Sequence, residues 1–89
     1  MARKKIIIPN RLGLHARAAS KLVALASRFA SNIEIIKDDK IVNAKSIMSI
    51  MMLAASQGTE IELHVEGEDE TEALQALTTL ISDCFGEEQ

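Results

Sequence analysis

Residues 10–21 of the chain read Asn10-Arg11-Leu12-Gly13-Leu14-His15-Ala16-Arg17-Ala18-Ala19-Ser20-Lys21. Upstream, residues 4–8 are rich in β-branched side chains and end at Pro9, which is typical of a strand terminus. Downstream, apolar residues recur every three or four positions, the spacing of one buried helix face. These residues are Ala18, Leu22, Leu25 and Phe29. The stretch therefore predicts a strand, a short loop in which Gly13 allows a tight approach, and a helix over residues 16–30 that begins beside His15.

Histidine is an unusual residue at a helix N-cap, because Ser, Thr, Asp, Asn and Gly satisfy the first-turn amides better. The amides of Ala16 and Arg17 lack intrahelical acceptors, and the helix dipole adds a partial positive charge. Such a helix end binds anions and disfavours an imidazolium ring, which leaves His15 neutral and nucleophilic. Arg17 can place its guanidinium on the oxygens of a phosphoryl group held by that ring. The alternative is a surface histidine satisfied by a neighbouring carbonyl.

Two segments resemble signature regions of HPr, the histidine phosphocarrier family of the bacterial phosphoenolpyruvate-dependent phosphotransferase system. The active-site signature is matched by Leu12-Gly13-Leu14-His15-Ala16-Arg17-Ala18. The regulatory-serine segment is matched by Lys45-Ser46-Ile47-Met48-Ser49-Ile50-Met51-Met52-Leu53. The two segments keep the family's order and separation, and the remaining pattern fits from about Ile6 to Phe85. On this resemblance, residues 1–89 form a single HPr-like phosphocarrier domain.

Length and composition restrict the class of protein. A chain of 89 residues forms one small domain, and with two Phe and no Trp or Tyr its core must be aliphatic. No apolar run approaches the ~20 residues of a membrane span. The N-terminal segment is too short for a signal peptide, and the single cysteine, Cys84, cannot form an internal disulfide. We therefore expect a cytoplasmic protein without membrane insertion.

Charge is distributed unevenly along the chain. Residues 1–45 hold all ten Lys and Arg and three acidic residues, for a net charge of +7, whereas residues 46–89 hold ten acidic residues and no Lys or Arg. The basic half contains the His15 helix, which favours electrostatic steering toward an acidic protein surface. The alternative is that these are only solvated faces. Nucleic acid is a weaker partner, because the whole chain has a charge of −3 and lacks stacking aromatics.

The rest of the chain predicts three further strands and two further helices. The strands are expected at Asn32–Lys37, Lys40–Asn43 and Glu60–Glu66. The helices are expected from Ser46 or Ile47 to Leu53, and from a capping-box-like start at Asp69 and Glu72 to Gly86. The order β-α-β-β-α-β-α predicts an α+β fold, an open-faced sandwich with helices on one face of a sheet. The resemblance implies a four-stranded antiparallel sheet with three helices on one face and the last strand between the first and second.

The helix after Ser46 carries more apolar residues than one buried face needs. One orientation of the helix points Ile47, Ile50, Met51 and Ala54 inward, and a small rotation would expose Met51 instead. Met48 and Met52 then remain at the rim, where flexible methionines suit an adaptable docking patch. The alternative is that all of these methionines fill the core. Ser46 itself predicts an N-cap, and the resemblance implies that an HPr kinase/phosphorylase phosphorylates this serine in many members.

The resemblance implies a carrier of phosphoryl groups and not an enzyme. His15 would accept a phosphoryl group through Nδ1 from phospho-enzyme I and donate it to an EIIA-type protein, while the Ala16 amide and Arg17 stabilise it. Partner contacts are expected at Leu14, Lys21, Lys45, Ile47, Met48, Met51 and Met52. The sequence has no phosphate-binding glycine loop, paired-carboxylate motif or metal-ligand cluster, so we expect no cofactor and no metal. We also expect a monomer.

Two other functions stay open on the residues alone. One is a regulatory protein-binding module controlled by Ser46, with little or no phosphoryl transfer. The other is a small acid–base or metal enzyme using His15 and His64, although His64 is expected on a remote strand face. Within the resemblance, both the sugar-transport HPr branch and the nitrogen-regulatory NPr branch keep His15 and Arg17. Ala16 stands where sugar-type members often carry Thr, which favours a regulatory role.

Overall fold

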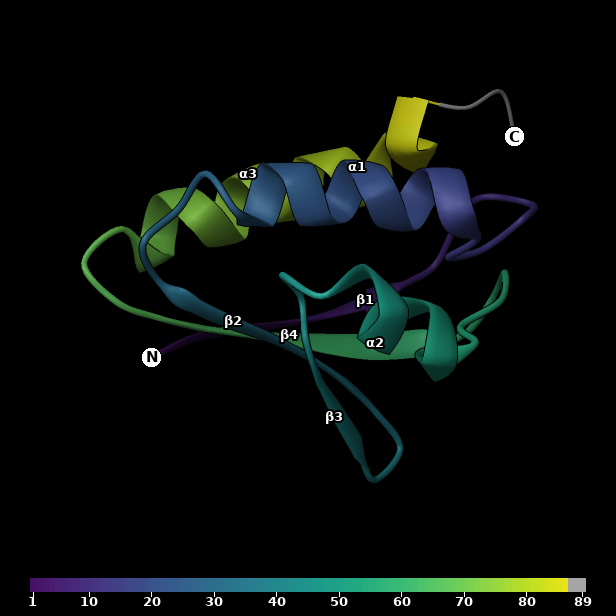
Figure 1. Cartoon of the computed structure of the whole chain (residues 1–89), viewed down its shortest axis with the longest axis horizontal. Coiled ribbons are helices and arrows are strands. Elements are labelled where there is room, and N and C mark those ends of the chain that lie inside the picture. Colours follow the sequence, from purple (N-terminus) through teal and green to yellow (C-terminus); the bar gives the residue numbers. More distant parts are fainter. Residues whose placement is uncertain (87–89) are drawn as a thin grey trace.

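The computed structural model describes residues 1–86 and has the predicted order of elements. The elements are β1 (Ala2–Ile7), α1 (Ala16–Ala26), β2 (Asn32–Lys37), β3 (Lys40–Asn43), α2 (Ile47–Leu53), β4 (Glu60–Glu66), α3 (Glu70–Ser82) and the short 3-10 helix η1 (Cys84–Gly86) (Figure 1). Three strands and α2 have the predicted bounds. The first strand lies earlier than expected, over Ala2–Ile7.

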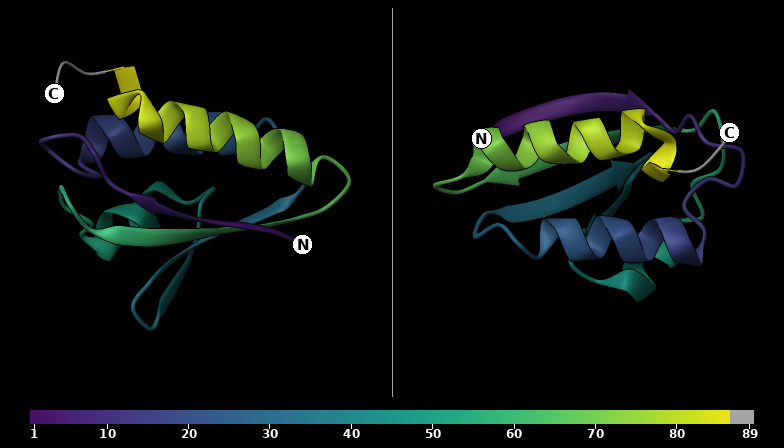
Figure 2. Two further views of the ribbon diagram at one scale, coloured as in Figure 1. Left: turned by 180° about the vertical axis from the view of Figure 1, so that it is seen from behind. Right: turned by 90° about the horizontal axis from the view of Figure 1, so that it is seen from above.

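The four strands form one antiparallel sheet in the order β1-β4-β2-β3. The predicted α+β fold, with β4 between β1 and β2, is therefore confirmed. Helices α1 and α3 lie side by side over one face of the sheet, and α2 lies beside α1 (Figure 2). The other face is left without helices. Glu60, Glu62, His64 and Glu66, which alternate with the buried residues of β4, lie on this face.

The core lies between the sheet and the helices, and it is aliphatic apart from Phe85. Alternation along β4 buries Ile61, Leu63 and Val65. The helices contribute residues spaced three or four apart, which form their buried faces. The fully buried helical residues include Ala18, Leu22, Ala26, Ile50, Leu53, Ala73, Leu77 and Ile81. This packing fixes both ends of α1 relative to the sheet. In residues 1–86, no helix has the length and apolarity that a membrane crossing requires.

Two helix boundaries differ from the prediction. Helix α1 ends at Ala26 and not at residue 30, because the chain then turns so that the Ala30 and Ser31 amides donate to the Asp69 carboxylate at 2.9 and 3.0 Å. Asp69 is the N-cap of α3 as expected, but its side chain makes no capping hydrogen bond to its own helix. Helix α3 itself ends at Ser82, before η1.

Candidate functional site

The start of α1 presents His15 at the N-cap, as predicted. The residue is extended, with φ −77° and ψ 178°, and its side chain makes no capping hydrogen bond. Its imidazole is half-buried, whereas Ala16 and Arg17 are exposed. The first turn of α1 carries no acidic residue, so no carboxylate of the helix itself offsets the positive helix end. The geometry therefore places the positive end of the helix dipole next to the imidazole.

The loop before His15 is held against the segment that follows α2. Asn10 Nδ2 donates to the Gly13 carbonyl at 2.8 Å, and the Leu14 amide donates to the Ala55 carbonyl at 2.9 Å. Gly13 has φ +64°, and a Cβ atom there would lie 2.5 Å from the Ala55 oxygen. This confirms the expected tight approach at Gly13. The backbone in front of the imidazole is thus fixed by contacts with a segment distant in sequence.

Helix α2 carries the exposed apolar surface that the sequence predicts, with one correction. Ile50 and Leu53 are fully buried and Ile47 is partly buried, whereas Met48, Met51 and Met52 are 67%, 42% and 73% exposed. The structure has the rotation that exposes Met51, and Ala54, which was expected to point inward, is exposed as well. Ile50 and Leu53 are three residues apart and share the buried face of α2. Met51, which directly follows Ile50, therefore points away from the core. We call Met48, Met51 and Met52 the methionine patch.

Three residues expected at a partner interface have roles within the chain. Leu14 is only 5% exposed and belongs to the core, so its side chain is not available to a partner. Lys21 Nζ donates to the Phe85 carbonyl at 2.6 Å, and Lys45 Nζ donates to the Phe29 carbonyl at 2.8 Å. Partner contacts by these lysines therefore stay a prediction, and they would compete with bonds already made.

Leu12 is an exposed apolar residue that was not predicted as a partner contact. Its side chain is 66% exposed in the loop that leads to His15. The apolar spacing that located the methionine patch does not extend into an irregular loop, so periodicity could not reveal it.

Ser46 has the structural role that was predicted. Its Oγ accepts a hydrogen bond from the Ser49 amide at 3.3 Å and caps α2, and the side chain is partly buried. This bond satisfies one of the unpaired donors in the first turn of the helix. Phosphorylation of Ser46 stays a prediction.

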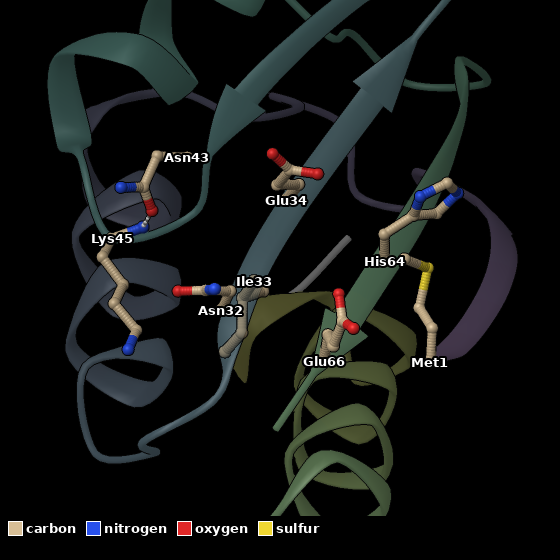
Figure 3. A pocket seen from close by; sticks show the side chains of 8 residues that line it. All are labelled: Met1, Asn32, Ile33, Glu34, Asn43, Lys45, His64 and Glu66. Carbon is tan, nitrogen blue, oxygen red and sulfur yellow. Dashed lines mark hydrogen bonds between the residues drawn. The ribbon is translucent and has the colours of Figure 1, made fainter.

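His64 lies on the open face of the sheet, at a pocket that does not include His15. The pocket has a volume of about 240 Å³, and Figure 3 shows side chains from β2, β3 and β4 around it. His64 Nε2 is 3.2 Å from a carboxylate oxygen of Glu62. Across residues 1–86, no three His, Cys, Asp or Glu side chains gather as metal ligands would. The geometry therefore does not bring His15 and His64 together in one acid–base or metal site.

The acidic groups with perturbed titration lie at the start of α3. Hydrogen bonds from the Ser31 hydroxyl and the Ala30 amide hold the pKa of Asp69 below its usual value. A hydrogen bond from the Gly67 amide likewise lowers the pKa of Glu70. Ala30 and Ser31 follow the C-terminal end of α1, so these carboxylates lie at the opposite end of that helix from His15.

Comparison with known proteins identifies the family. The family model of the PTS HPr component phosphorylation site matches residues 2–83. The phosphocarrier protein HPr of Neisseria meningitidis is 54% identical over 87 residues, which are 98% of each chain. The crystal structure of HPr from Thermoanaerobacter tengcongensis is 53% identical, covers 100% of both chains and has a TM-score of 0.97. Crh of Bacillus subtilis, a dimer with a swapped domain, is 45% identical over 94% of this chain and 97% of its own, with a TM-score of 0.76. The chain therefore belongs to the HPr family of phosphocarrier proteins of the phosphotransferase system.

Proposed function

We propose that His15 of this phosphocarrier takes a phosphoryl group from phospho-enzyme I and passes it to an EIIA-type protein. The observation that carries the proposal is the position of His15 at the N-cap of a helix that has no acidic residue in its first turn. A phosphoryl group brings about two negative charges. The helix end stabilises such charge by about 0.3–1 kcal/mol at an exposed site.

The transfer step makes one bond and breaks one bond. The lone pair of neutral His15 Nδ1 attacks the phosphorus, and the bond from phosphorus to the donor histidine nitrogen breaks with its electron pair remaining on that nitrogen. The Ala16 and Arg17 amides and the Arg17 guanidinium neutralise the negative charge on the phosphoryl oxygens. Phosphoryl transfer depends on positioning and charge stabilisation more than on covalent help from the protein. Transfer to the acceptor repeats the same step in the other direction.

The methionine patch supports a role as a carrier that docks transiently on larger proteins. Its three side chains are flexible and exposed, and such surfaces adapt to more than one partner. Ile47 lies at the edge of the patch and is partly buried. Lys21 and Lys45 add positive charge that would attract an acidic partner surface. His15 is partly exposed at the start of α1, where the active site of a larger protein can reach it, so we infer that the chain is a carrier and not an enzyme.

Further expectations belong to the same proposal. We infer that residues 1–89 act as one cytoplasmic domain, that the working form is a monomer, and that an HPr kinase/phosphorylase acts on Ser46. The pathway served is sugar uptake, carbon–nitrogen regulation or both. Crh shows that a related chain can dimerise, so size-exclusion chromatography with light scattering should be run on the sample used for phosphorylation.

The test incubates the chain with phosphoenolpyruvate and enzyme I and follows the product by phosphorus NMR. We expect one acid-labile phosphohistidine in the wild type and in His64→Ala, and none in His15→Ala. Label that persists in His15→Ala, or an acid-stable phosphate, would contradict the carrier mechanism. Binding of enzyme I without any transfer would favour the alternative, a regulatory binding module controlled by Ser46.

A further inference from the structure

Lys37 occupies a position on β2 where the strand pattern calls for an apolar residue. Side chains alternate along a strand, so Lys37 lies on the same face as the buried Ile33 and Ile35. Its Nζ donates to the Leu53 carbonyl at 3.1 Å and to the Ala54 carbonyl at 3.4 Å. The side chain therefore reaches from the end of the sheet to the C-terminal end of α2.

The C-terminal end of α2 has no basic residue of its own, so a cation from another segment would stabilise it. The last carbonyls of a helix have no intrahelical donors, and the dipole makes this end negative. Helix α2 has no basic residue in its own last turn, and its C-cap, Ala54, is in the left-handed region with φ 55°. Lys37 supplies the missing positive charge across the chain and holds the strained turn at Ala54.

The turn that Lys37 holds is the one that anchors the loop before His15. Directly after Ala54, the Ala55 carbonyl accepts the Leu14 amide at 2.9 Å. A continuous series of contacts thus runs from Lys37 through the end of α2 to Leu14, whose next residue is the N-cap His15. A displacement of the Ala55 carbonyl would move the backbone that places the imidazole.

We propose that Lys37 is a positioning residue for phosphoryl transfer at His15, acting through the α2 C-terminus and the Ala55 carbonyl. The proposal rests on the function proposed above, but the structural link can be tested in the chain alone. Lys37→Met removes the ammonium and keeps much of the aliphatic stem. Lys37→Arg restores a donor. Lys40→Met is the matched control, because Lys40 lies opposite Lys37 in the hairpin and is exposed.

The experiment measures hydrogen exchange of the Leu14 amide, with the Leu63 amide in β4 as a reference for global opening. In Lys37→Met we expect Leu14 to exchange about three- to tenfold faster than in the wild type, while Leu63 changes little. The His15 ring signals should shift in the same variant, and Lys37→Arg should restore both readouts. With saturating enzyme I, phosphorylation of Lys37→Met should slow, whereas Lys40→Met should match the wild type.

Equal Leu14 exchange in Lys37→Met and Lys40→Met would overturn the proposal. So would equal acceleration of Leu14 and Leu63, because Lys37 would then stabilise the fold as a whole without positioning the loop. If wild-type His15 is never phosphorylated, the proposed function fails, while the exchange data still decide whether Lys37 holds the loop. Unchanged His15 signals and an unchanged transfer rate, beside faster Leu14 exchange, would also contradict a positioning role.

Discussion

Helices α1 and α3 are both preceded by a closely packed glycine, but they differ from the N-cap residue onward. In each, a glycine lies two residues before the N-cap, namely Gly13 before His15 and Gly67 before Asp69. Each glycine packs so closely on a distant segment that a Cβ atom would lie 2.5 Å from an oxygen of that segment. The two helix starts are therefore placed by the same device, and their N-cap regions differ in charge.

The start of α3 is rich in negative charge. The Asp69 carboxylate accepts hydrogen bonds from the Ala30 amide and from the amide and hydroxyl of Ser31, and the first turn holds Glu70 and Glu72. The start of α1 has a histidine without a capping bond and no acidic residue in its first turn. At the start of α3 the chain itself supplies negative charge, which stabilises the fold. The first turn of α1 has no such charge, and there we propose that the helix end receives an anion from a partner.

The largest expected effect comes from Gly13→Ala, which disrupts the close packing of the loop before α1 against Ala55. The new Cβ would lie 2.5 Å from the Ala55 oxygen, at a residue with φ +64°. We expect the free energy of unfolding to fall by about 2–4 kcal/mol from backbone strain and overpacking together. Gly58→Ala is the control, since Gly58 has φ +88° and nothing within 4 Å of its Cβ position. It should lose about 1–2 kcal/mol. Equal losses in urea denaturation would show that the contact with Ala55 contributes nothing.

Arg17→Ala removes the positive side chain from the first turn of α1. The guanidinium is exposed and makes its proposed bond only to the phosphoryl group, so the fold should be unaffected. We expect phosphorylation by enzyme I to slow about tenfold, at the lower end of what a charged hydrogen bond contributes. Arg28→Ala, beyond the far end of α1, is the matched control and should keep the wild-type rate. Equal slowing in both variants would indicate only long-range steering by net charge.

Ala16→Glu copies the acidic first turn of α3 onto α1. A carboxylate at a helix N-terminus stabilises it by about 0.3–1 kcal/mol, so the urea midpoint should rise slightly. The same charge repels a phosphoryl group, and we expect transfer to slow about threefold. Ala16→Gln has a side chain of the same size without the charge and should change neither quantity much. Faster transfer in Ala16→Glu than in Ala16→Gln would contradict the claim that negative charge in the first turn of α1 opposes phosphoryl transfer.

Asp69→Asn tests whether the Asp69 carboxylate at the start of α3 stabilises the fold, through the pH dependence of unfolding. The folded-state pKa of Asp69 lies below the unfolded value of 3.8, so the carboxylate stabilises the fold above that pH. This stability is lost as the pH falls through the folded pKa. Asp69→Asn should therefore have a lower urea midpoint than the wild type at neutral pH, and the two midpoints should converge in strong acid. The transfer rate at neutral pH should not change. A constant difference between the midpoints at every pH would contradict the assignment.

Periodicity and turn chemistry sufficed for most of the architecture, because the signals lie within single segments. The strand at Glu60–Glu66 was predicted with its observed bounds, and Ser46 predicted the cap of α2. The strand order came from the family resemblance, since a pattern within one strand does not say which strand lies beside it. The early end of α1 was missed, because the cause is a contact between Ser31 and Asp69, which are far apart in sequence.

Within the candidate site, local signals located His15, Ala16 and Arg17 at the helix start. The burial of Leu14 was missed, and the choice between an inward and an exposed Met51 stayed open, because both depend on how α1 and α2 dock on the sheet. Lys37 could have been noticed, since a lysine that continues the buried alternation of β2 breaks a local rule. Its partners at the end of α2 could not have been named without the structure.

Amide NMR spectra before and after phosphorylation by enzyme I test whether the start of α1 holds the phosphoryl group. If the start of α1 receives the phosphoryl group, the amides of Ala16 and Arg17 should shift strongly downfield as they donate to its oxygens. The amides of Glu70 and Thr71, at the start of α3, should stay in place. Phosphorylated His15 with unmoved Ala16 and Arg17 amides would contradict the account, because the helix end would then play no part in holding the phosphoryl group.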